Sequence, residues 1–116
     1  MPESSRPSRV SEEFREILAE AVFKLKDPRV GFVTIVRVTV TPDLRHARVF
    51  YTALGEERER KATAAGLRSA APHLRKVIGD QVRLKVLPEL EFEQDRSVET
   101  VDRIERLLHD LHREDA

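Results

Sequence analysis

The four histidines are the residues whose chemistry would first suggest catalysis or metal binding. His109 and His112 lie three residues apart near Glu105 and Asp110, and at this spacing a helix presents side chains on one face to a metal ion. The same spacing is typical of an ordinary solvated helix face. His46 has no serine placed to complete a nucleophilic triad. We therefore expect no metal site and no catalytic histidine.

Other signatures of catalysis are also missing from the sequence. The chain contains no cysteine, which excludes disulfides, thiolate metal sites and cysteine nucleophiles. Its four glycines are too scattered to form a phosphate-binding loop or a dinucleotide fingerprint. Carboxylates are numerous, but no pair stands in an apolar stretch that would separate two pKa values for acid–base catalysis. The sequence predicts a non-enzymatic protein that needs no cofactor.

Basic side chains gather around a proline in the second half of the chain. Residues 66–87 contain five basic side chains against one acidic side chain, a net charge of +4. If Pro72 begins a new helix, the amides of the next turn are free to bind a phosphate. The alternative is that small residues let two helices pack closely beside a solvated charged face. The nucleic-acid contacts predicted here are Arg68, Ala70, Ala71, Pro72, His73, Arg75, Lys76, Arg83 and Lys85.

Charge is distributed unevenly along the chain, although the net charge is zero. Residues 1–90 carry 17 basic against 12 acidic side chains, and residues 91–116 carry 4 against 9. A phosphate backbone responds to this local field and not to the total. A second basic contact patch is predicted near the first helix, formed by Arg6, Arg9, Lys26 and Arg29.

The elements that position these residues follow from hydrophobic periodicity. Residues 10–25 have an apolar stripe of helical period, and Pro28 is expected to end that helix. Residues 32–40 and 47–53 alternate as the two strands of a hairpin around the turn at residues 41–43. The first strand is expected to bury Phe32, Val36, Val38 and Val40.

A helical period returns over residues 56–80, but Pro72 interrupts it. A proline inside a helix loses a hydrogen bond and clashes with the preceding turn, at a cost of roughly 3 kcal/mol. Two short helices that meet at a kink are therefore expected. A third strand is predicted over residues 82–92, where Pro88 implies an edge position or a bulge. An amphipathic helix is expected over residues 98–111.

The predicted fold is α+β, in the order α-β-β-α-kink-α-β with an added C-terminal helix. We expect a flexible N-terminus over residues 1–8, an RNA-binding domain over residues 9–94, and an acidic C-terminal helix over residues 95–116. No stretch approaches the ~18 consecutive apolar residues of a membrane span, and no signal-like segment indicates export. A cytoplasmic protein without a membrane partner is expected.

This order of elements resembles a type II K-homology domain, whose paired helices clamp the backbone of single-stranded RNA. Usual members carry a GxxG loop between those helices, and this chain has none. It instead resembles the ribosome-binding factor A family, in which an Ala-x-Gly kink replaces the loop. The segments that carry the resemblance are Arg6–Val10, Lys26–Gly31, Thr41–Leu44, Ala47–Val49, Leu74-Arg75, Arg83–Lys85 and Pro88–Phe92.

The resemblance implies a monomer that binds 16S rRNA in free 30S ribosomal subunits and assists late maturation of that RNA without catalysis. It also implies a link to growth in the cold. One position departs from the family pattern, because Pro72 stands where the kink usually ends in glycine. Proline breaks a helix at least as firmly as glycine, so the kink is expected to be present and rigid.

Two further hypotheses place the function elsewhere. Arg37, Arg48 and Phe50 share the outer face of the predicted sheet and could offer a platform on which an RNA base stacks. Arg83 and Lys85 would join them if that face is continuous. Alternatively, the chain is a protein-interaction module whose acidic C-terminal helix docks a basic partner or closes over the RNA surface.

Overall fold

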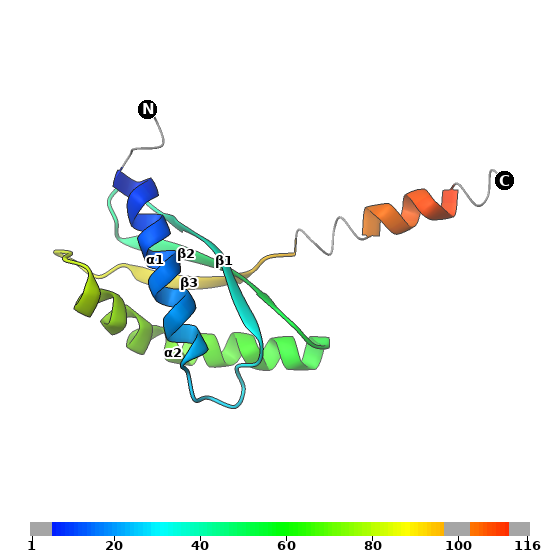
Figure 1. The fold of residues 1–116 in the computed structure, drawn as a ribbon, viewed down its shortest axis with the longest axis horizontal. Coiled ribbons are helices and arrows are strands. Elements are labelled where there is room, and N and C mark those ends of the chain that lie inside the picture. The colour runs from blue at the N-terminus through cyan, green and yellow to red at the C-terminus, as the bar shows by residue number, and fades with distance from the viewer. Residues whose placement is uncertain (1–5, 97–102, 112–116) are drawn as a thin grey trace.

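The computed structural model describes residues 6–96 and 103–111 of the chain. Two helices lie against one face of a three-stranded sheet, and their apolar side chains form one core with the inward side chains of the strands (Figure 1). The α+β class is confirmed. The elements are α1 (Arg6–Phe23), β1 (Val33–Val40), β2 (His46–Ala53), α2 (Glu57–Gln81) and β3 (Glu89–Gln94), and residues 103–111 form a further helix.

The sheet has the strand order β1-β2-β3. β1 and β2 pair antiparallel as the predicted hairpin, whereas β3 pairs parallel to β2, from His46 opposite Glu89 to Tyr51 opposite Gln94. Parallel strands need a crossover connection, and α2 provides it. Ala47, Val49 and Tyr51 are buried, as their alternation predicted. The sheet is therefore mixed, with β3 at one edge.

The first strand buries Val38 and Val40, as simple alternation predicted, but not Phe32 and Val36. A β-bulge between Ile35 and Arg37 inserts an extra residue, so Ile35 and Val38 both face the core. Val36 is consequently exposed, and Phe32 precedes the strand with 81% of its surface exposed. The prediction that Phe32 and Val36 are buried was wrong, because a bulge shifts the period-two pattern by one residue.

α1 covers the sheet with Phe14 and Leu18, both fully buried. The helix ends at Phe23, well before the proline that was expected to stop it. The amide of Lys24 still bonds the carbonyl of Glu20 at 3.2 Å, and the chain then enters a turn. Pro28 lies within that turn and does not end the helix directly.

α2 is one helix of 25 residues with Pro72 inside it. Leu67, Leu74 and Ile78 are completely buried along one face, so the predicted apolar stripe is confirmed. The prediction of two short helices was wrong, because helical backbone geometry continues through the proline. The ribbon of α2 nevertheless changes direction along its length (Figure 1), as expected where an interior proline removes a backbone bond.

The third strand is shorter than predicted. Only Glu89–Gln94 pairs with β2, and residues 82–88 form an irregular loop between α2 and the strand. Pro88 is fully buried at the end of this loop and leads directly into the edge strand. Arg83 and Lys85 consequently lie on a loop and not on a strand.

The C-terminal helix is present over residues 103–111. The start of the predicted helix, at Val98 and Val101, lies outside the described residues. The predicted division into residues 1–8, 9–94 and 95–116 stays a prediction.

Candidate nucleic-acid interface

The outer face of α2 carries an exposed row of predicted contact residues. Arg68, Pro72 and Lys76 are four residues apart, so they lie above one another on the same side of the helix, and all three are exposed. His73 is exposed beside them. Ala70 is half-buried and packs against the core, and Ala71 is also half-buried. The helix therefore offers two cations flanking a proline, over a surface with small side chains.

The free amides predicted after Pro72 are not available for a phosphate. Because α2 continues through this position, the amides of the following turn lie inside the helix, where they bond carbonyls one turn earlier. An anion at this surface would meet side-chain cations and not an open helix N-terminus. This part of the prediction was wrong.

Arg75, the central residue of the predicted basic cluster, is engaged within the fold. Its Nε donates to the Pro88 carbonyl at 2.9 Å, and its terminal nitrogen donates to the Leu87 carbonyl at 3.0 Å. The same nitrogen lies 3.6 Å from a carboxylate oxygen of Glu89, and the side chain is 32% exposed. Arg75 thus fastens the 82–88 loop to α2 and has little capacity left for a phosphate.

A basic side chain that the sequence did not single out joins Arg83 and Lys85. Arg45, from the turn between β1 and β2, lines a cavity of about 530 Å³ together with both of them. The parallel pairing of β2 with β3 brings the two loops together, and the Glu89 amide bonds the Arg45 carbonyl at 2.8 Å. Asp43 also lines the cavity. Strand order was needed to find this cluster, and the linear sequence does not reveal it.

The carboxylate of Asp43 is already occupied by its own turn. It accepts hydrogen bonds from the Thr41 hydroxyl at 2.7 Å and from the Arg45 amide at 3.0 Å. These bonds, the hydroxyl bond above all, lower the pKa of Asp43 below its ordinary value. The carboxylate is therefore charged near neutral pH and partly offsets the cations around the cavity.

The second predicted patch divides into two separate places. Arg6 and Arg9 lie in the first turns of α1, whereas Lys26 and Arg29 lie on the turn beyond its other end. About 21 Å of helix separates Arg9 from Phe23, at the usual rise per residue. Arg9, Lys26 and Arg29 are exposed, but the two ends of α1 are too far apart for these positions to form one contact.

The turn that carries Arg29 packs closely on α2. The Thr63 hydroxyl donates to the Arg29 carbonyl and accepts from the Gly31 amide, both at 3.3 Å. Gly66 permits the approach, because a Cβ there would lie 2.6 Å from a methyl group of Val30. Arg29 itself pairs with Asp27 at 2.7 Å, and this bond is the main reason that the pKa of Asp27 is lowered.

The outer sheet face is less open than the stacking hypothesis requires. The guanidinium carbon of Arg37 lies 4.1 Å from the centre of the Phe50 ring, and Phe50 is half-buried. Arg48 is paired with Glu93 at 3.5 Å, and Glu91 lies beside them along the strand. Arg37 already occupies one side of the ring and Glu91 and Glu93 add negative charge nearby, so this face is the weaker candidate for binding RNA.

Neither metal chemistry nor a membrane span finds support in the described part of the chain. Over residues 6–96 and 103–111 no three acidic or histidine side chains gather in a way that could hold a metal ion. His112 lies outside those residues. No helix within the same ranges is long and apolar enough to cross a membrane.

Fold and surface together define an α+β domain with basic surface loops, in which one long, proline-containing helix crosses over between parallel strands. The family model described as "Ribosome-binding factor A" matches residues 6–108. The chain therefore belongs to the ribosome-binding factor A family. The chain is similar to ribosome-binding factor A of Geobacter sulfurreducens, with 44% identity over 95% of this chain and 94% of that protein. Its identity to the Azoarcus protein of that name is 46%, over 97% and 90% of the two chains.

Solved structures of related proteins have the same fold. The solution structure of a putative ribosome-binding factor A from Thermotoga maritima gives a TM-score of 0.73 at 36% identity, covering 81% of this chain and 91% of that one. The crystal structure of the Thermus thermophilus factor gives 0.71 at 27% identity, over 78% and 97%. A Thermus thermophilus model fitted into a cryo-EM map of a 30S–RbfA complex gives 0.63 at 29% identity, over 74% and 91%.

Proposed function

We propose that this protein binds the immature 30S ribosomal subunit through 16S rRNA, assists late maturation of that RNA without catalysis, and acts as a cytoplasmic monomer. Family membership is the observation that carries the proposal, together with the relative whose coordinates were fitted into a map of a 30S complex. Binding energy would perform the work, because a factor shifts an RNA conformational equilibrium only by its differential affinity for the two conformers.

The surface that best supports this function runs from the outer face of α2 to the loops beside its C-terminal end. Its cations are exposed, whereas Arg75 donates to two backbone carbonyls, and we name this surface the α2 surface. Its members are Arg45, Arg68, Lys76, Arg83 and Lys85, with Pro72 and His73 between them. Phosphate contacts made by such side chains supply affinity that falls as salt rises.

Charge reversal of two exposed lysines on the α2 surface tests the proposal. The variant Lys76→Glu/Lys85→Glu should weaken co-sedimentation with free small subunits. It should also reduce the slope of log affinity against log salt by about 1.4 if each lysine contacts one phosphate of single-stranded RNA. The matched control is Arg58→Glu/Lys61→Glu, which changes the charge equally at the exposed first turns of α2. Equal loss in both variants would show that total charge, and not this surface, determines binding.

A further inference from the structure

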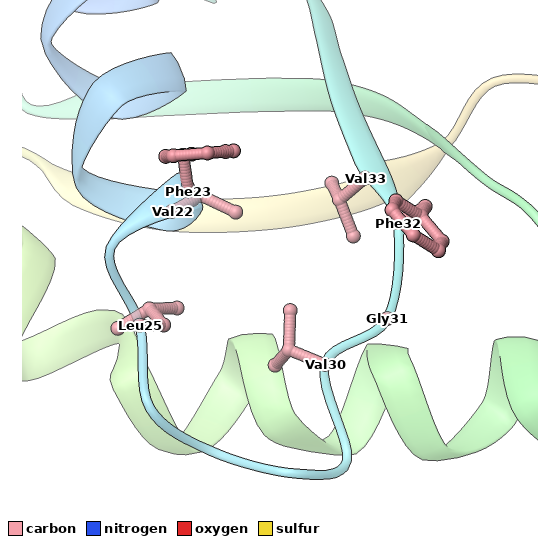
Figure 2. A pocket seen from close by; sticks show the side chains of 7 residues that line it. All are labelled: Val22, Phe23, Leu25, Val30, Gly31, Phe32 and Val33. Atoms are coloured by element: carbon pink, nitrogen blue, oxygen red, sulfur yellow. The ribbon is translucent and has the colours of Figure 1, made fainter.

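An apolar cavity lies apart from the α2 surface and shares no residue with it. The cavity has a volume of about 360 Å³ and lies between the end of α1, the turn after it and the start of β1 (Figure 2). Phe23 and Phe32 stand on opposite sides of it, 89% and 81% exposed. Exposed aromatic side chains beside an apolar cavity are typical of a docking surface. The cavity is lined by Val22, Phe23, Leu25, Val30, Gly31, Phe32 and Val33.

The helix over residues 103–111 presents an exposed apolar face. All of its residues are exposed, including four large apolar side chains with 51–58% of their surface in solvent. Their spacing of three and four residues forms one stripe, the pattern by which a helix fills an apolar groove. A helix this short gains much of its stability from packing of its apolar face. The stripe consists of Ile104, Leu107, Leu108 and Leu111.

We propose that the helix over residues 103–111 docks through this apolar stripe into the cavity between Phe23 and Phe32 of its own chain. The proposal does not depend on RNA binding, because neither the apolar stripe nor the cavity includes any of the cations to which we assign RNA binding.

The segment between β3 and the helix over residues 103–111 is long enough for that helix to reach the cavity. Gln94, at the end of β3, pairs with Tyr51, and Tyr51 pairs with Ile35, three residues after Phe32. Two strand spacings across the sheet and three residues along it amount to about 14 Å. The eight residues between Gln94 and the described helix can span up to about 29 Å. A short tether also keeps the effective concentration of the helix at the cavity high, which favours its own chain over a second copy.

The charge of the C-terminal segment is complementary to the charge beside the cavity. Residues 97–116 carry six acidic against three basic side chains. Lys24 and Lys26 are exposed beside the cavity, and Lys24 reaches Glu20 at 2.8 Å along the helix. An acidic segment approaching these lysines lowers the electrostatic energy of the docked arrangement. The cationic surface of another protein would gain nothing comparable from the lysines at this cavity.

The test uses the full chain with a spin label and measures amide signals by NMR. The chain has no cysteine, so Glu105→Cys places a single label on the helix beside its apolar stripe. Signals from residues 22–33 should be lost through paramagnetic broadening in the labelled protein. Leu107→Ser/Leu108→Ser should restore them, whereas the control Arg106→Ser/His109→Ser, on the opposite face of the helix, should not. Phe23→Ser/Phe32→Ser should restore the signals as well, since both rings are largely exposed and can be replaced without loss of the core.

Three outcomes would overturn the proposal. Signals of residues 22–33 that persist in the labelled protein would show that the helix does not dock there. Broadening that persists in Leu107→Ser/Leu108→Ser and in Phe23→Ser/Phe32→Ser would show that the contact is not apolar. Broadening seen when spin-labelled protein without isotope is mixed with isotope-labelled protein lacking the spin label would assign the cavity to a second copy of the chain.

Discussion

At the scale of single residues, Arg75 and Lys76 are adjacent in sequence and differ completely in role. Arg75 donates to two backbone carbonyls, of Pro88 and Leu87, at the point where the loop enters β3. Lys76 is exposed on the outer face of α2. The sequence identified both as cations of one basic segment, and only the position of the loop separates them. Charge density predicts a basic surface, whereas hydrogen-bond partners decide which cation is free to bind a phosphate.

Replacing each of these residues by methionine should therefore have different consequences. Arg75→Met should lower the free energy of unfolding by about 1.5–3 kcal/mol, the usual range for a hydrogen-bonded charged group. Lys76→Met should change it by no more than about 0.5 kcal/mol, as expected for an exposed side chain. Urea unfolding measures both values. Equal stability of the two variants would contradict the role of Arg75 in holding the loop.

Asp27 gives the turn after α1 a dependence on pH. Its pKa in the folded protein is lowered below the ordinary value of 3.8, chiefly by the hydrogen bond from the Arg29 side chain. A lowered folded pKa means that the stabilising contribution is complete above the unfolded pKa and is lost as pH falls through the folded pKa. The wild-type protein should lose more stability than Asp27→Asn between about pH 5 and pH 2. Parallel urea denaturation series across this range make the comparison, and identical pH profiles would contradict it.

At the scale of elements, the sequence predicted the type and order of the main helices and strands, because their apolar periods are clear. Its errors fall where a local feature altered the period. The bulge in β1 exposes Val36. Residues 82–88 alternate in polarity as a strand would, although they form a loop. The proline in α2 bent the helix without dividing it. Favourable packing of Leu67 and Leu74, on either side of Pro72, offsets the local cost of the proline.

Removal of the proline from α2 should stabilise the fold. Pro72 is exposed, so Pro72→Ala loses little packing and should raise the free energy of unfolding by up to about 3 kcal/mol. Pro72→Gly should raise it by about 1 kcal/mol less than alanine does, because glycine is a poorer helix former than alanine. Chemical denaturation of the three proteins gives these differences. A loss of stability in Pro72→Ala would instead show that the bend is needed to seat both halves of α2 on the core.

At the scale of the whole molecule, the neutral net charge conceals two regions of opposite sign. Residues 1–96 carry a net charge of +3, and residues 97–116 carry −3. The core that holds Phe14, Leu18 and Leu67 contains no apolar side chain from residues 103–111. Removing the acidic segment should therefore leave the domain folded and make its surface more attractive to RNA.

Deletion of residues 97–116 should increase affinity for free small subunits at low salt, and the gain should shrink as salt rises. The physical reason is that acidic side chains tethered to the domain repel phosphates over a distance of about one Debye length, ~8 Å at physiological ionic strength. Filter binding or sedimentation across a salt series measures the gain. Replacing Glu99, Glu114 and Asp115 by their amides in the full chain separates charge from contact. If repulsion is the cause, that variant gains affinity in the same direction as the deletion. Weaker binding after deletion, with unchanged binding of the amide variant, would mean that the segment itself contacts the subunit.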